Sequence, residues 1–187
     1  MLVVRGIDVR EIQVLESVGC CVGVFLKHFV VAFEVTQHGK AETDLTFDAN
    51  ECVRAASPKL ADAGVPMALV TNTRRGLTER ALDRIGRHYF VATVCADEVP
   101  RGKPAPDPYQ RAAALLGLEP AQCLAIEDSV AGARAAEDAG CPVLVVPNDF
   151  DVPAGPRRYH VTSLAEVDLD RLVAIHHALQ LDPEPTA

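Results

Sequence analysis

Apolar and polar residues alternate in regular blocks from about residue 52 onward. Continuous apolar runs bounded by turn residues predict strands buried on both faces, over 65–70, 91–96, 123–128 and 141–146. Between these runs, apolar residues recur at helical spacing and predict helices over 52–64, 77–90, 109–118 and 129–140. Ser129 and Gly140 are the predicted caps of the last of these helices. A short strand and a helix follow before a frayed tail at 181–187.

Alternating strands and helices of this kind predict an α/β fold, a doubly wound parallel sheet with helices on both faces. In such sheets, ligands bind at the carboxyl ends of the strands. Polar residues follow three of the predicted strands, and we expect them to converge on one edge of the sheet. They are Thr71 and Asn72, then Lys103 in a proline-rich loop, then Glu127 and Asp128.

Composition narrows the classes of partner. The net charge is -8, with no basic stripe, which argues against nucleic acid and anionic membranes as partners. The apolar segment 18–33 is interrupted by Lys27 and His28, so it predicts a strand or two rather than a membrane-spanning helix. The 6 cysteines form no C-x-x-C pair, and the chain start does not resemble a signal peptide. We therefore expect free thiols in a reducing cytoplasm.

The polar residues at the strand ends suit phosphoryl transfer. Adjacent carboxylates at Glu127 and Asp128 provide hard oxygen ligands for Mg²⁺. Lys103 supplies a positive charge for a phosphate, and Thr71 supplies a hydroxyl beside strand-end amides that can bind an anion. Asn72, the next residue, is a further candidate for phosphate binding. Singly, these features have structural explanations: a turn, a solvated lysine and acids at a helix N-terminus. Their order and spacing together favour the functional interpretation.

Three segments resemble the haloacid dehalogenase-like hydrolases, in particular the branch of β-phosphoglucomutase and phosphoglycolate phosphatase. They are "VPMALVTNT", "RGKPAPDPYQRAAALLGLEP" and "CLAIEDSVAGARAAEDAGCPVLVV", and the resemblance covers about residues 58 to 170. It implies a Rossmann-like core and Mg²⁺-dependent chemistry. It also implies that Thr71 binds the phosphoryl group, that Lys103 clamps nucleophile and phosphate, and that Glu127 and Asp128 hold the metal.

The first motif of that family, D-x-D, is absent from residues 1–60. Asp8 follows an apolar stretch near the start and is the preferred candidate for nucleophile and additional metal ligand, with Arg10 where the second aspartate would stand. A guanidinium stays protonated and cannot cycle a proton, so turnover would be impaired. Asp48 is the alternative, but few residues separate it from Thr71.

The helical cap that this branch inserts before Thr71 is expected to be reduced or absent. Residues 13–50 are β-branched and cysteine-bearing, and lack an amphipathic helical pattern. We therefore divide the chain into a divergent segment at 1–50, which holds a first core strand and the remnant of a cap region, an α/β core at 51–180 and the tail. Segment 1–50 is either genuine, truncated or frameshifted.

The sequence thus predicts Mg²⁺-dependent phosphoryl transfer on a small phosphorylated metabolite, by a phosphatase or a phosphomutase-like enzyme. The alternative is a catalytically inactive protein that binds Mg²⁺ or a phosphorylated ligand. A nucleotide-binding α/β domain is disfavoured because no G-x-G-x-x-G or P-loop follows any predicted strand. The sequence leaves the substrate and the oligomeric state open.

Overall fold

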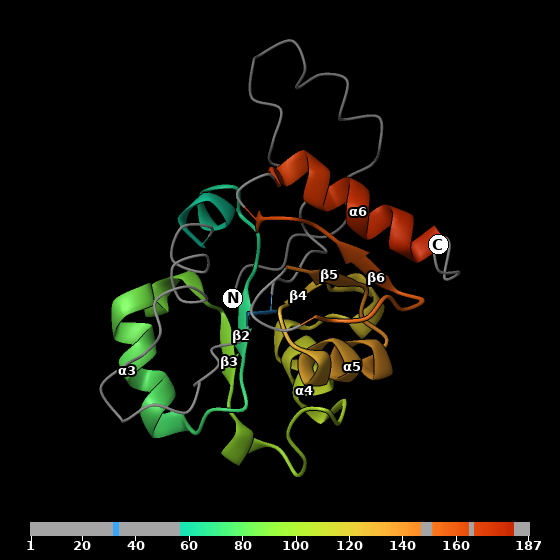
Figure 1. The fold of residues 1–187 in the computed structure, drawn as a ribbon. Helices are drawn as coiled ribbons and strands as arrows, with labels where there is room; N and C mark the ends of the chain where they lie inside the picture. Colours follow the sequence, from blue (N-terminus) through green and yellow to red (C-terminus); the bar gives the residue numbers. More distant parts are fainter. Residues whose placement is uncertain (1–31, 34–56, 147–150, 165–166, 182–187) are drawn as a thin grey trace.

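A six-stranded parallel sheet forms the centre of the molecule (Figure 1). The computed structural model describes residues 32–33, 57–146, 151–164 and 167–181. The strands are β1 (Ala32–Phe33), β2 (Ala68–Val70), β3 (Ala92–Val94), β4 (Ala125–Glu127), β5 (Val143–Val145) and β6 (Arg158–His160). Their order is β3-β2-β1-β4-β5-β6 and each neighbouring pair is parallel. The chain moves outward from β1 first to one side and then to the other, which confirms the doubly wound α/β fold.

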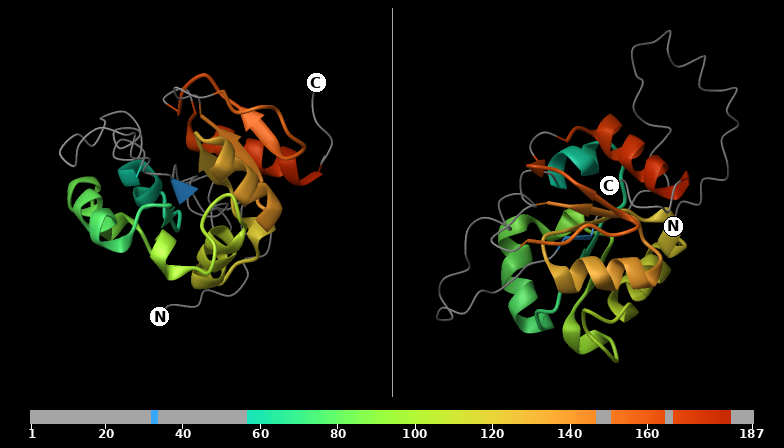
Figure 2. Two further views of the ribbon diagram at one scale, coloured as in Figure 1. Left: turned by 60° about the horizontal axis from the view of Figure 1, so that its bottom comes forward. Right: turned by 45° about the vertical axis from the view of Figure 1, so that its right-hand side comes forward.

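Helices cover both faces of this sheet. They are a helix at 57–62, α3 (Arg75–Ile85), α4 (Asp107–Leu116), α5 (Val130–Ala139) and α6 (Leu169–Leu181). Short 3₁₀ turns, η3 (Arg87–Tyr89), η4 (Ala96–Glu98) and η5 (Pro120–Gln122), complete the described connections. Figure 2 shows α6 on the opposite face of the sheet from α5.

Successive strand residues point to opposite faces and separate two hydrophobic clusters. Leu69, Ile126 and Leu144 pack on the side of α3 and α6, with residues such as Leu82 and Leu172. The intervening residues pack on the side of α4 and α5, and this second cluster is made largely of small side chains: Ala68, Val70, Ala112, Ala113, Ala125, Ala133, Ala136 and Val143. Small side chains let both helices approach the sheet closely. Both faces of β2, β4 and β5 are buried, as their continuous apolar runs predict.

The helix boundaries differ modestly from the predicted ones. Ser129 caps α5 by accepting a hydrogen bond from the Gly132 amide at 3.0 Å, and Gly140 ends it in the left-handed conformation at φ 100°, so both predicted caps are confirmed. The predicted helix 77–90 ends at Gly86, after which the chain continues as η3. The short strand predicted after 141–146 is β6, which begins at Arg158 and pairs with β5.

The central strand β1 comes from the first third of the chain. Ala32 pairs with Ala68 on one side and with Ala125 on the other. This strand lies at the end of the apolar segment 18–33 for which a strand or two was predicted. The strand expected before Asp8, the remainder of the region 13–50 and the tail after Leu181 lie outside the described residues. The division at residue 50 therefore remains a prediction.

Cys95, Cys123 and Cys141 are free and buried, as expected for reduced thiols in the core of the described part of the chain. Burial raises the pKa of Cys123 from 9.0 to about 12, and it also raises the pKa of Cys141. Because the thiolate is the reactive form, we expect iodoacetamide to leave all three thiols unmodified in the native protein at pH 8. Peptide mass spectrometry measures this directly, and the urea-denatured protein serves as the reactive control.

The same raised pKa values make stability depend on pH. The folded state holds the thiol protons more tightly than the unfolded state, so this contribution is complete below about pH 9. It is then lost as the pH rises toward 12, and urea midpoints should fall over that window. Rapid alkylation of Cys123 at pH 8 without denaturant would contradict this description of the core.

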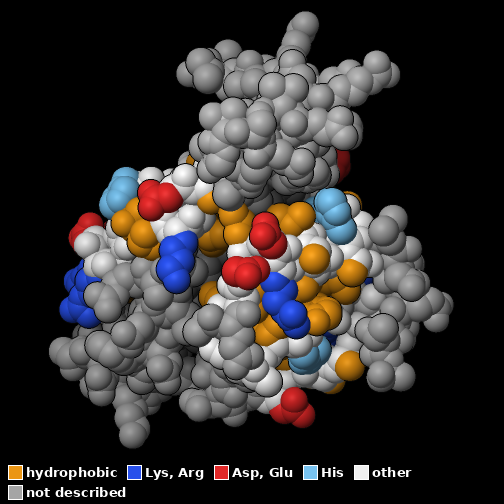
Figure 3. All heavy atoms as spheres, turned by 90° about the horizontal axis from the view of Figure 1, so that it is seen from above, with side chains coloured by type: hydrophobic (Ala, Val, Ile, Leu, Met, Phe, Trp, Pro, Cys, Tyr) orange, Lys and Arg blue, Asp and Glu red, His pale blue; other side chains and the backbone are white. Residues whose placement is uncertain are grey.

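The surface of the described residues gives few signs of a large interface. On the face seen in Figure 3, acidic and basic side chains lie interspersed with apolar ones. Over the whole described surface, the exposed large apolar residues are Leu77, Val91, Leu115 and Val130, which lie on different segments of the chain. Among the helices of the described part of the chain, none is both long and apolar enough to span a membrane.

Candidate functional site

A buried ion pair joins the carboxyl ends of β2 and β4. The Lys103 ammonium lies 2.6 Å from Glu127 Oε1, and neither side chain is exposed to solvent. The same Nζ donates to the backbone carbonyl of Val70 at 3.1 Å. Val70 is the last residue of β2, so this contact places the ammonium directly beside Thr71. The side chain of Lys103, a loop residue, therefore lies at the edge of the sheet where the strands end.

Glu127 is surrounded by donors from several elements. The Tyr109 hydroxyl in α4 donates to Oε1, and the Ser129 hydroxyl at the start of α5 donates to Oε2 at 3.2 Å. Gly132 in α5 makes room for the carboxylate, because a Cβ atom there would lie 1.9 Å from Oε2. Buried charges are tolerated when they are paired and hydrogen-bonded, and Glu127 meets both conditions.

Asn72 fixes the loop that carries Lys103. Its Nδ2 donates to the Lys103 carbonyl at 2.9 Å, while its Oδ1 accepts from the Lys103 amide at 2.8 Å. Gly102 permits this approach, since a Cβ there would lie 2.7 Å from Asn72 Oδ1. The Asn72 side-chain amide therefore binds protein backbone in this structure, whereas we predicted that it binds phosphate.

Replacing Asn72 with Asp tests this clamp. The carboxylate can still accept from the Lys103 amide, but it cannot donate to the Lys103 carbonyl and would instead face that oxygen. We expect the free energy of unfolding to fall by about 1–2 kcal/mol, as measured by urea denaturation. Gln110→Glu makes the same change of charge on an exposed face of α4 and should cost less than about 0.5 kcal/mol. Equal costs for the two variants would rule out the clamp.

Thr71 is buried at the same edge. Its Oγ1 accepts from the Thr73 amide at 3.0 Å, which closes a tight turn immediately after β2. The first residue of α3, Arg75, is also held near this turn. Its guanidinium donates to both carboxylate oxygens of Glu98, at 2.8 and 2.6 Å. This contact holds the pKa of Glu98 below its ordinary value. The turn 71–74 is therefore held between β2 and α3.

The edge of the sheet also holds carboxylates that could contribute to a metal site. Within the described residues, no three His, Cys, Asp or Glu side chains are grouped closely enough to hold one. Glu127 forms an ion pair with Lys103, whereas Asp128 is half-buried on the turn between β4 and α5. Mg²⁺ commonly uses one or two carboxylates together with water and phosphate oxygens. Asp128 is compatible with that ligand chemistry, and it is the described carboxylate we would assign first.

The structure thus brings Thr71, Lys103 and Glu127 to one edge, as the strand ends predict, while Asp8 lies outside the described residues. Sequence reasoning missed Tyr109 and Gly132 as parts of the site. The sequence pattern places Tyr109 at the start of the predicted helix 109–118. The available signal was its hydroxyl, because a tyrosine in a buried helix face needs a hydrogen-bond partner.

The fold is that of a known class of hydrolase. The model of the haloacid dehalogenase-like hydrolase family matches residues 15–140. The chain belongs to this family, and its relatives place it in the branch of phosphoglycolate phosphatase and β-phosphoglucomutase.

Two relatives illustrate the likeness in sequence. The chain is 36% identical to the plasmid-encoded protein CbbY of Cupriavidus necator over 143 residues, which covers 65% of this chain and 56% of the relative. It is 37% identical to phosphoglycolate phosphatase of Thiobacillus denitrificans over 111 residues, with coverages of 59% and 45%. The chain thus spans about half the length of these curated relatives.

A solved structure shows the same likeness in three dimensions. CbbY from Rhodobacter sphaeroides in complex with phosphate matches with a TM-score of 0.56 and 28% sequence identity, covering 73% of this chain and 72% of that one.

Proposed function

We propose that this protein is a Mg²⁺-dependent phosphohydrolase or phosphomutase-like enzyme that acts on a small phosphorylated metabolite. The observation that carries the proposal is the Lys103 ammonium, which is buried against Glu127 and the Val70 carbonyl at the carboxyl edge of the sheet. Several relatives are themselves named as phosphatases, including fructose-1-phosphate phosphatase YqaB and hexitol phosphatase A of Escherichia coli. Its buried free thiols are compatible with a cytoplasmic protein.

Each residue has a distinct role in this proposal. Lys103 neutralises negative charge on the phosphoryl oxygens, and Glu127 holds the ammonium in place. Thr71 and the amides that follow β2 bind the phosphoryl group. Asp128 holds Mg²⁺, which would screen the phosphate charge and orient the group for in-line attack. Catalysis of this kind depends on positioning and charge neutralisation, and a rigid strand edge supplies both.

The test is hydrolysis of p-nitrophenyl phosphate with Mg²⁺ and after its removal by EDTA. Lys103→Met should lower kcat/KM by about 10²–10³-fold, the usual effect of removing one group that stabilises developing charge. Lys59→Met removes an exposed lysine from the helix at 57–62 and should leave the rate unchanged. Equal rates for wild type and Lys103→Met would refute the role of Lys103.

The nucleophile has to be identified by the same assay. The sequence favours Asp8, whereas the described sheet has Ala32–Phe33 as its central strand, and Glu34 is the next residue in the sequence. We propose Asp8 and compare Asp8→Asn with Glu34→Gln. Loss of turnover only in Asp8→Asn supports the proposal. Full activity in Asp8→Asn together with loss in Glu34→Gln transfers the role to the residue after β1.

A specific observation also favours a second function, phosphate binding without turnover. D-x-D is absent from residues 1–60, and the described carboxylates form no group of three. This alternative predicts that calorimetry detects binding of inorganic phosphate in the presence of Mg²⁺ while no hydrolysis is measured. Turnover that depends on Mg²⁺ and on Lys103 would eliminate it.

A further inference from the structure

Tyr109 contacts both members of the buried ion pair. Its hydroxyl donates to Glu127 Oε1, the oxygen that also receives the Lys103 ammonium at 2.6 Å. Its ring faces the ammonium, with Nζ 5.2 Å from the ring centroid. A cation at that distance over an aromatic ring is attracted to it. One side chain from α4 therefore stabilises the anion and the cation together.

This arrangement matters because Lys103 is intrinsically mobile. A lysine side chain has four rotatable bonds and presents a point charge, so its position depends on the groups around it. Reactive groups generally have to be held within about 0.5 Å of their working geometry. Glu127 can fix the ammonium only if the carboxylate is itself fixed. The Tyr109 hydroxyl supplies that restraint on Oε1, and the Ser129 hydroxyl supplies it on Oε2 at 3.2 Å.

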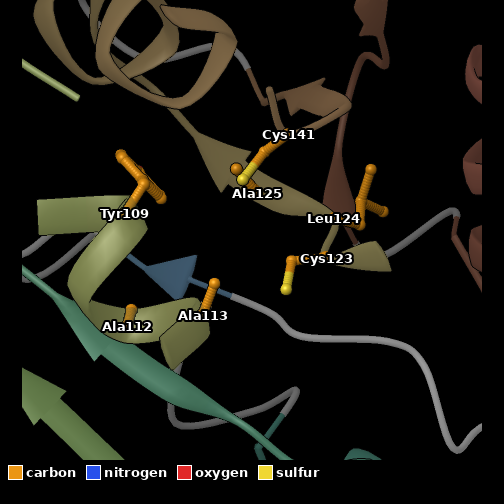
Figure 4. Close-up of a pocket in the computed structure, with 7 residues that line it drawn as sticks. All are labelled: Tyr109, Ala112, Ala113, Cys123, Leu124, Ala125 and Cys141. Atoms are coloured by element: carbon orange, nitrogen blue, oxygen red, sulfur yellow. The ribbon is translucent and has the colours of Figure 1, made fainter. Parts of the chain in front are cut away.

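The Tyr109 ring lies buried beside a small cavity. The side chain is buried at 3% exposure, but a small cavity of about 10 Å³ adjoins it. Figure 4 shows Tyr109 on α4, with Ala125 of β4 and the nearby Cys123 and Cys141 across the cavity from it. The cavity is too small for a ligand larger than about one water molecule. The ring is therefore held by packing together with its hydroxyl bond to Glu127.

We propose that Tyr109 is a positioning residue for Lys103. The hydroxyl holds Glu127 Oε1, the ring faces the ammonium, and the two contacts together set the point at which Lys103 meets the phosphoryl group. This proposal rests on the function proposed above for the same edge. A role confined to packing would require the ring and not the hydroxyl.

Tyr109→Phe separates these roles because it keeps the ring and removes the hydroxyl. The matched control is Tyr159→Phe. Tyr159 lies on β6, away from the site, and its hydroxyl accepts a hydrogen bond from Arg171 at 3.3 Å. The first measurement is the acylation rate of the Lys103 amine by an N-hydroxysuccinimide ester, relative to exposed Lys59 in the same molecule. We expect this ratio to rise about five- to tenfold in Tyr109→Phe, and to stay unchanged in Tyr159→Phe.

The second measurement is the Kd of inorganic phosphate by calorimetry with Mg²⁺, which needs no turnover. We expect Tyr109→Phe to weaken it about five- to tenfold, and any measurable hydrolysis to fall in kcat by a similar factor. Urea unfolding shows whether both variants remain folded. Unchanged Lys103 labelling overturns the positioning role. Raised labelling with unchanged phosphate affinity overturns the link to the phosphoryl group.

The two proposals fail in different ways. If the wild-type protein neither binds phosphate nor hydrolyses the ester, the proposed function and the phosphoryl part of this inference fall together. The labelling ratio would still decide whether Tyr109 positions Lys103. If the wild type hydrolyses the ester and both tyrosine variants bind phosphate as tightly as the wild type, the proposed function stands and the inference is wrong.

Discussion

Glu127→Gln is expected to lower the free energy of unfolding by about 3 kcal/mol or more. The variant keeps the size of the side chain and removes its charge, which leaves the Lys103 ammonium buried beside a neutral amide. Breaking one side of a buried pair typically costs about 3–5 kcal/mol because the remaining charge is uncompensated. Both side chains here are fully buried, so solvent cannot screen the loss. Urea denaturation at neutral pH measures the effect.

Two further variants sharpen this measurement. Glu79→Gln removes one member of an exposed pair with Arg75 and should cost less than about 1 kcal/mol. Lys103→Met combined with Glu127→Gln removes both charges and should recover much of the lost stability, while phosphate binding stays absent. If Glu127→Gln were no more costly than Glu79→Gln, the pair could not be as buried as the structure describes.

Gly132→Ala is the second variant with a large expected effect. The added methyl group would lie 1.9 Å from Glu127 Oε2 and 2.2 Å from its Cδ, so the carboxylate must leave its hydrogen-bonded position or α5 must move away. Crowding and the disturbed ion pair should together cost about 3 kcal/mol, and alanine's better helix propensity recovers only about 1 kcal/mol. Phosphate affinity should fall with stability.

Gly76 provides a matched control for this change. It lies in the first turn of α3, as Gly132 does in α5, and no atom lies within 4 Å of the position its Cβ would take. Gly76→Ala should therefore stabilise the protein by about 0.5–1 kcal/mol. A stabilising Gly132→Ala would show that Glu127 does not occupy the position described beside α5.

Much of the core follows from local sequence rules. The runs that contain β2, β4 and β5 are apolar on both faces, and Ser129 and Gly140 mark the ends of α5 through capping chemistry. The convergence of Thr71, Lys103 and Glu127 follows from the rule for strand ends in parallel sheets. These predictions need only periodicity, capping and topology.

The separate roles of Glu127, Asp128 and Asn72 in the site could not be predicted from these rules. Adjacent Glu127 and Asp128 are indistinguishable as metal ligands in a sequence, and only tertiary packing directs Glu127 toward Lys103. Asn72 binds the Lys103 backbone across 31 positions, a contact with no local signature. Gly132 likewise appears as an ordinary helical residue until its distance to Glu127 is known.

The central position of β1 has a consequence for how the chain folds during synthesis. β1 pairs with β4 through Ala32 and Ala125, which lie 125 − 32 = 93 positions apart. At about 5–20 residues per second, the ribosome delivers β4 some 5–20 s after β1. Until then β1 has a partner only in β2, and its second edge is open to other chains. The sheet can close only late in translation, and interrupted synthesis would leave an unpaired edge at its centre.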